Sequence, residues 1–230
     1  MTSIHNGPGS LSGHRPPGET VSPGGAAGLR RFTGTPTRAA MTEERCELCG
    51  ERVGDGHAHM VDLQRRSIAC ACTACALLFS RPGGRYRTVP DRVRDDLRNP
   101  LTEAEWAELA VPVGIAFFFI NSALDRVVAG YPSPAGVTEC ELDLAAWDRL
   151  AGAHPLLAEL EPDVEAILVV RGQPYTPDSQ SAQVYLIPID TCYSLAGALR
   201  LNWRGFDGGT EVRRILGDLL ADLRRRARQI

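Results

Sequence analysis

The sequence contains no lysine, because all 25 of its basic residues are arginine. A Schiff-base lysine and the lysine of a phosphate-binding P-loop are therefore both excluded. Neither sign of charge is in large excess, since 25 basic and 28 acidic residues give a formal net charge of −3. This balance disfavours a strongly basic nucleic-acid binder and a highly charged disordered chain.

Long apolar runs are also lacking. The longest one, Leu109 to Ile120, is interrupted by Pro112 and Gly114. A bilayer-spanning helix needs about 20 apolar residues, so this run predicts a buried strand instead. Residues 1–30 contain no apolar segment of the length that a signal peptide requires. We therefore expect a cytoplasmic protein.

The chain has 230 residues, which suffices for one domain with a small addition. Residues 1–40 hold eight glycines, five prolines and nine serines or threonines, a composition that buries too little apolar surface to fold. We predict a disordered arm there, with Met41 as an alternative start of the protein. A metal module is predicted over residues 41–88 and an α+β domain over residues 89–230.

The strongest pattern consists of two Cys-x-x-Cys motifs, Cys46/Cys49 and Cys72/Cys75, which 22 residues separate. A Cys-x-x-Cys turn directs two thiolates at one metal ion, and two such turns complete a tetrahedral shell. Gly50 follows the first pair and suits a tight turn. Zinc is the metal expected in this shell, and iron is the alternative. A module this small gains much of its stability from the metal.

Three further metal-ligating side chains lie in the same module. Cys70 is interpreted either as a buried strand residue or as a fifth thiolate that assists metal exchange or redox chemistry. His57 and His59 alternate along a predicted strand, so they share one face. Either histidine is an alternative ligand or a hydrogen-bond donor to the site, and a solvated strand edge is the other interpretation.

Periodicity and capping patterns predict the remaining elements. Thr102 with Glu105 is typical of a capping box, and Asp143 and Asp190 are predicted helix N-caps. The apolar residues after Gly208 recur at helical spacing, which indicates a final amphipathic helix. Strands are predicted over residues 57–64, 67–70, 113–121, 126–131, 164–170 and 182–189.

The predicted fold class is therefore α+β. A small zinc-ribbon-like module with four cysteine ligands precedes an α+β domain with a largely antiparallel sheet and a C-terminal amphipathic helix. The strands between the two cysteine pairs form the predicted ribbon.

No catalytic residue is predicted from the sequence, although an enzyme is not excluded. Ser133 would need a base to act as a nucleophile, and His154 is the only histidine of the predicted domain. A closed shell of four cysteines leaves no open position for a substrate.

A glycine-rich segment near the C-terminus has the composition of an interaction surface, with two aromatic residues and an arginine. We therefore predict that Trp203, Arg204 and Phe206 bind a protein partner. The alternative is that both aromatic side chains pack under the last helix.

Several collinear segments resemble one protein family. Besides the cysteine module, they are Arg85–Pro90, Val111–Phe118, Tyr131–Gly136, Tyr185–Asp190 and Trp203–Gly209. Together they resemble an uncharacterised family of high-GC bacteria whose genes lie in NiFe-hydrogenase clusters, over residues 41–230. The family has no assigned activity. The resemblance implies an accessory role, with a hydrogenase subunit or maturation factor as partner.

The predicted function is that of a non-catalytic metal-binding accessory protein, in which a structural zinc ribbon is joined to a partner-docking domain. The alternative is a rubredoxin-like iron protein that transfers electrons. Rubredoxins are similar in pairing two Cys-x-x-Cys-Gly turns, but the second turn here has Ala76 in place of glycine, and Cys70 is extra.

Overall fold

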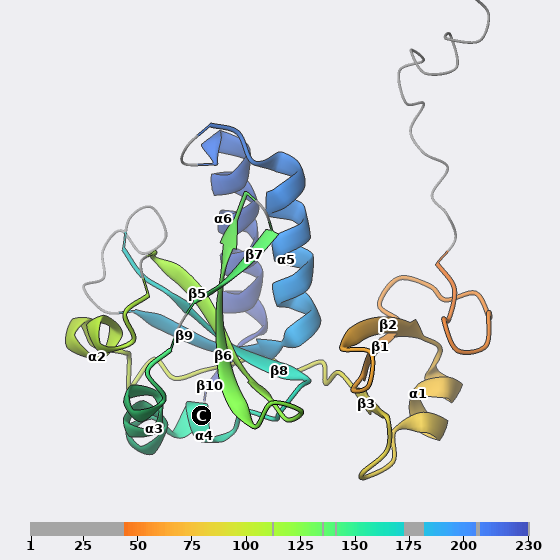
Figure 1. Cartoon of the computed structure of the whole chain (residues 1–230). Helices are drawn as coiled ribbons and strands as arrows, with labels where there is room; N and C mark the ends of the chain where they lie inside the picture. Colours follow the sequence, from red (N-terminus) through yellow and green to blue (C-terminus); the bar gives the residue numbers. More distant parts are fainter. Residues whose placement is uncertain are drawn as a thin grey trace, which may run out of the picture. The chain divides into compact units, whose positions relative to one another are not determined.

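Figure 1 shows the computed structural model of the chain. The structure describes residues 44–111, 113–134, 136–140, 142–172, 182–205 and 208–229. These residues belong to one compact unit that starts at Glu43. The predicted arm over residues 1–40, the alternative start Met41 and the side chain of Phe206 lie outside the described residues.

The N-terminal module contains a three-stranded antiparallel sheet in the order β2-β1-β3. The strands are β1 (Ala58–Asp62), β2 (Ser67–Ala71) and β3 (Tyr86–Thr88), and helix α1 (Thr73–Phe79) connects β2 to β3. The first two strands confirm the hairpin that the sequence predicts. The sequence predicts neither this helix nor β3.

Asp62 closes the β1–β2 hairpin. Its carboxylate accepts hydrogen bonds from the backbone N–H groups of Gln64 and Arg65, both at 3.1 Å, and from the Arg85 guanidinium. The Arg85 hydrogen bonds outweigh the burial of Asp62 and lower the pKa of its carboxyl to about 2. The hairpin therefore depends on an ionised Asp62.

We expect Asp62→Asn to destabilise the protein by about 1 to 3 kcal/mol at neutral pH, because the hydrogen bonds that Arg85 donates to the buried side chain lose their charged acceptor. The pKa of Asp62 is lower in the folded chain than its ordinary 3.8. Its stabilising contribution is thus complete above about pH 4 and is lost as the pH falls toward 2. The free energy of unfolding of the wild type and of Asp62→Asn, measured as a function of pH, checks this. A difference that stays constant down to pH 2 would contradict it.

The larger sheet has seven strands in the order β10-β4-β9-β8-β5-β6-β7. All neighbouring pairs are antiparallel except β10 with β4, which confirms the largely antiparallel sheet. The strands are β4 (Arg94–Asp95), β5 (Ile115–Asn121), β6 (Arg126–Ser133), β7 (Gly136–Cys140), β8 (Glu165–Val170), β9 (Gln183–Pro188) and β10 (Arg228–Gln229).

Helices cover both faces of this sheet (Figure 1). They are α2 (Glu103–Glu108), α3 (Leu144–Ala153), α4 (Pro155–Ala158), α5 (Ile189–Asn202) and α6 (Gly209–Arg226). Side chains alternate along the strands, so that Ile167 packs toward α2, α3 and α4, and Leu168 toward α5 and α6. Burial on both faces explains why β5, β8 and β9 are nearly unbroken apolar runs. Among the described residues, no helix has the length and apolar character that crossing a membrane requires.

Most predicted helix starts are present. Thr102 and Glu105 form the capping box of α2, and the Asp143 carboxylate accepts from the backbone N–H of Ala145 at 2.9 Å. The prediction for Asp190 is wrong. Pro188 is the N-cap of α5, so Asp190 lies in the first turn of the helix, and its carboxylate contacts His59 instead.

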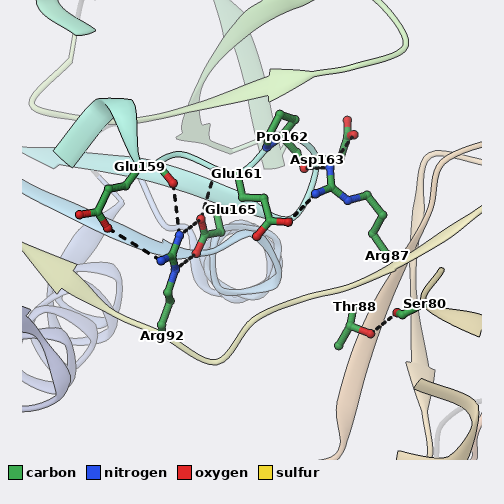
Figure 2. A network of polar contacts seen from close by, with 9 residues as sticks. All are labelled: Ser80, Arg87, Thr88, Arg92, Glu159, Glu161, Pro162, Asp163 and Glu165. Atoms are coloured by element: carbon green, nitrogen blue, oxygen red, sulfur yellow. Dashed lines mark hydrogen bonds and ion pairs between the residues drawn. The ribbon is translucent and has the colours of Figure 1, made fainter. Parts of the chain in front are cut away.

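Ion pairs join distant parts of the chain, and one of them includes a buried carboxylate (Figure 2). Arg92 donates to both carboxylate oxygens of Glu165, and Glu165 is fully buried. In the same view, Arg87 of β3 donates to Glu161 and to the carbonyl oxygen of Pro162. An apolar cluster of Val61, Val89, Val164 and Ile189 adds to this contact. The module is therefore fixed to the larger sheet by charge and by apolar packing.

Candidate metal centre

The first cysteine pair lies in a tight turn before β1. Two backbone hydrogen bonds close the turn. The N–H of Gly50 donates to the carbonyl oxygen of Cys46 at 2.8 Å, and the N–H of Cys46 donates to the carbonyl oxygen of Glu51 at 2.8 Å. Gly50 has a φ of +79°, in the left-handed region that side chains disfavour. The glycine therefore permits a turn that carries Cys46 and Cys49 on the same side.

We expect Gly50→Ala to cost about 1 to 2 kcal/mol, because an L side chain is strained at this φ. A Cβ atom there would meet nothing within 4 Å, so the cost comes from the backbone alone. Gly54→Ala is the matched control, since its Cβ atom also meets nothing within 4 Å and its φ is not in that region. Chemical denaturation of the metal-loaded proteins checks this. Equal stability of the two variants would contradict it.

The second cysteine pair begins a helix. Cys72 is the N-cap of α1, and its sulfur accepts the backbone N–H of Cys75 at 3.4 Å. The N–H of Ala76 donates to the carbonyl oxygen of Cys72 at 2.9 Å. Ala76 is thus an ordinary helical residue, so this position needs no glycine. The two cysteine pairs therefore have different backbone geometry, unlike the two similar turns that the sequence suggests.

Glu47 holds the first turn against β2. Its backbone N–H donates to the carbonyl oxygen of Cys70 at 2.9 Å, and its carboxylate accepts the N–H of Cys70 at 2.9 Å. Because Cys72 follows two residues after Cys70, this clamp brings the two cysteine pairs together. Glu47 lies within the first motif, yet the sequence gives no signal of this role.

The four cysteine sulfurs of the two motifs lie within 4.8 Å of one another. The sulfurs of Cys49 and Cys72 are 3.7 Å apart. A tetrahedral zinc–thiolate shell with bonds of about 2.3 Å has sulfurs about 3.8 Å apart, so the cluster has the dimensions of a metal site. Cys46 and Cys75 are buried, whereas Cys49 is exposed.

The surroundings favour a thiolate at Cys46. Burial raises the pKa of this thiol, but backbone N–H groups of Cys72, Leu48 and Cys49 outweigh it and bring the pKa to about 6. Burial and then the neighbouring thiols raise the pKa of Cys75 to about 12. Four thiolates so close together repel one another, and a divalent cation among them removes that repulsion.

The three other predicted ligands form a group of their own. Cys70 on β2 pairs with His59 on β1, and the ligand atoms of these two residues and His57 lie within 4.8 Å of one another. All three residues are half-buried, so they do not form a fully solvated strand edge. Burial, and then the carboxylates of Glu44 and Glu47, raise the pKa of the Cys70 thiol.

The serine and histidine considered as a catalytic pair have other partners. His154 is buried, with Nδ1 at 3.2 Å from the Asn99 carbonyl oxygen and Nε2 at 3.0 Å from the Glu105 carboxylate. Ser133 accepts a hydrogen bond from the Thr138 hydroxyl at 2.8 Å. These contacts indicate that His154 joins α2 to the α3–α4 junction.

The residues predicted to bind a partner differ in how far they are buried. Trp203 is half-buried against the α5–α6 side of the core, and its Nε1 donates to the Gly205 carbonyl oxygen at 3.1 Å. Arg204 is exposed, and Phe206 lies outside the described residues. Trp203 thus matches the alternative interpretation, packing near the last helix.

Exposed apolar side chains occur instead on α1. Leu77 is 77% exposed, Leu78 is 61% exposed and Phe79 is 45% exposed. Consecutive helical residues point about 100° apart, so a short helix cannot bury all three. Their exposure depends on α1, which the sequence does not predict.

A cavity of about 540 Å³ lies between the β1–β2 hairpin and the strands β5 and β6. Its lining includes Val61, Ile68, Phe119, Val128 and Tyr193, and no cysteine or histidine among the described residues. The cavity is therefore separate from both groups of metal-ligating side chains.

Comparison with known proteins identifies one family. A model of the family of unknown function DUF5947 matches residues 45–227, which include both cysteine motifs and all but the last strand of the larger sheet. Neither the curated proteins nor the solved structures gave a match. Since the match covers most of the sequence, the chain belongs to the DUF5947 family, whose function is unknown.

Proposed function

We propose that this protein is a non-catalytic accessory protein in which Cys46, Cys49, Cys72 and Cys75 hold one structural zinc ion. The observation that carries the proposal is the group of four sulfurs within 4.8 Å of one another. Four cysteine ligands close a tetrahedral shell, which is typical of structural zinc sites and leaves no position for a substrate.

The small core of the module supports a structural role for the metal. Its apolar cluster contains five buried residues, Cys46, Met60, Ala71, Cys75 and Ala76, and two of them are proposed ligands. Without a metal, the buried thiols would be held together by weak contacts alone. Zinc adds a large free energy of binding to such a module, on the order of 10 kcal/mol.

A protein partner is the second part of the proposal, with a hydrogenase subunit or maturation factor as the partner. The support is the attachment of the module to the larger sheet through Arg87 and the Val61 cluster, which keeps its surface in one position. Leu77 and Leu78 are exposed on that surface, beside the second cysteine pair.

Electron transfer through a rubredoxin-like iron centre is the second candidate. It is favoured by the exposure of Cys49, because an exposed sulfur ligand gives an electron a short path to a partner. The geometry of the second pair at a helix start favours the zinc proposal, since it departs from the paired turns of rubredoxins.

Metal analysis of the untagged full chain, with a visible absorption spectrum of the same sample, tests the proposal. One or more equivalents of zinc and no colour would support it. One iron per chain with thiolate-to-iron absorption would replace it by the electron-transfer candidate. A metal-free, folded protein that binds neither ion would contradict both.

A further inference from the structure

The group of His57, His59 and Cys70 has the side chains of a metal site but belongs to neither cysteine motif. His59 and Cys70 lie opposite each other on β1 and β2, and His57 lies just before β1 on the same face. One ligand atom from each residue lies within 4.8 Å of the others. The two imidazole rings are 4.8 Å apart and inclined by 75°.

Both histidines are held through Nδ1. The Nδ1 of His57 donates to the Gly54 carbonyl oxygen at 3.0 Å, and the Nδ1 of His59 donates to the Asp190 carboxylate at 2.6 Å. Since a carbonyl and a carboxylate only accept hydrogen bonds, each Nδ1 carries the proton. In the neutral rings, the lone pair of each Nε2 is then available to a metal.

His57 presents an unpartnered nitrogen. Its side chain is 9% exposed, and its Nε2 is buried without a hydrogen-bond partner among the described residues. A buried acceptor without a partner is costly, so such atoms in native proteins usually serve a ligand or a reaction. The histidine that carries this orphaned nitrogen belongs to the same group as His59 and Cys70.

We propose that His57, His59 and Cys70 form a second metal site, which binds a divalent transition-metal ion through Nε2, Nε2 and Sγ. Imidazole and thiolate ligands together favour zinc and its neighbours in the first transition row. With three protein ligands, the fourth position is open to water or to an exchangeable donor. Around a bound ion with bonds of about 2.0 to 2.3 Å, ligand atoms are about 3.3 to 3.8 Å apart, so this group would contract on binding.

Asp190 is the positioning residue of this site. It lies in the first turn of α5, whereas both histidines belong to the cysteine module. A carboxylate that accepts the Nδ1 proton orients the ring and increases the basicity of Nε2. The metal would therefore strengthen the His59–Asp190 contact, which joins the module to the larger sheet.

Cobalt titration of the full chain, already loaded with one equivalent of zinc, tests the second site. Zinc stays in the four-cysteine site because it binds such ligands more tightly than cobalt does. We expect one equivalent of cobalt per chain, with the visible bands of a four-coordinate ion and charge transfer from a single thiolate. With a second equivalent of diamagnetic zinc in place of cobalt, the nitrogen chemical shifts should move at Nε2 of both histidines.

Variants separate the ligands from the positioning residue. Cys70→Ser should abolish the charge-transfer band, while Cys140→Ser, the control that removes a thiol outside the module, should retain it. Asp190→Asn should weaken cobalt binding by about 10- to 100-fold without changing the number of thiolates bound. Retention of the band in Cys70→Ser would overturn the proposal.

The wild-type result is decisive by itself, so the test does not depend on the folding of any variant. No cobalt bound to the zinc-loaded chain would overturn the second site. The proposal does not rest on a structural role for the four-cysteine site. If that site fails to hold zinc, cobalt in the second site is still recognised by its single thiolate, because a four-cysteine cobalt centre has four.

Discussion

Replacing Cys46 or Cys75 by serine is expected to release the metal of the four-cysteine site and to unfold the module around it. Both residues are buried in the apolar cluster of the module, so each substitution removes a ligand and buries a hydroxyl. The lost free energy of metal binding, on the order of 10 kcal/mol, is larger than a core of this size can replace.

Hydrogen exchange with metal analysis of the same samples measures this effect. Amides of β1 and β2 should lose their protection in Cys46→Ser, whereas the strands β5 and β8 should keep theirs. Cys140→Ser is the control, since its position in β7 lies outside both groups of ligands. Equal loss of metal in Cys140→Ser would show that the ligand assignment is wrong.

Arg92→Met is expected to destabilise the larger domain by about 3 to 5 kcal/mol, because it leaves the carboxylate of Glu165 buried without its cation. Glu165 is fully buried, at the start of β8, and Arg92 donates to its two oxygens at 2.5 and 2.8 Å. Figure 2 shows that Arg92 also reaches Glu159. The substitution therefore breaks the centre of a polar network around a buried carboxylate.

Replacing the acidic partner of Arg92 should lower the free energy of unfolding by less. In Glu165→Gln, the side chain of Arg92 is 39% exposed and can be solvated, and the amide still accepts one hydrogen bond. Arg149→Met is the matched control, because Arg149 pairs with Glu108 at 2.8 Å on the surface and should contribute less than about 1 kcal/mol. Denaturant unfolding of the three variants measures the order of their losses in unfolding free energy. Similar stability of Arg92→Met and Arg149→Met would show that the buried Glu165 carboxylate does not depend on Arg92.

Local patterns were sufficient where neighbouring residues interact. The capping box of Thr102 and Glu105 and the Asp143 cap each depend on contacts within a few positions, and both are present. The same reasoning fails for Asp190, because its partner His59 is 131 positions away. A local rule could not detect that competing contact.

Short strands with distant partners also escaped prediction. β4 and β10 have two residues each, and their pairing joins Arg94 to Arg228. Strands this short carry no periodicity, so only the tertiary fold defines them. Likewise, the spacing of the four cysteines identified them as one group, but the separation of Cys70 and the two histidines into another depends on the register of β1 and β2.

X-ray absorption at the zinc edge, on the full chain loaded with a single equivalent of zinc, identifies the ligands of the bound ion. We expect four sulfur ligands at about 2.3 Å and no nitrogen or oxygen ligand. A first shell that includes histidine nitrogen or water would mean that the single ion prefers the group of His57, His59 and Cys70. That result would contradict a closed four-cysteine centre as the principal metal site of this protein.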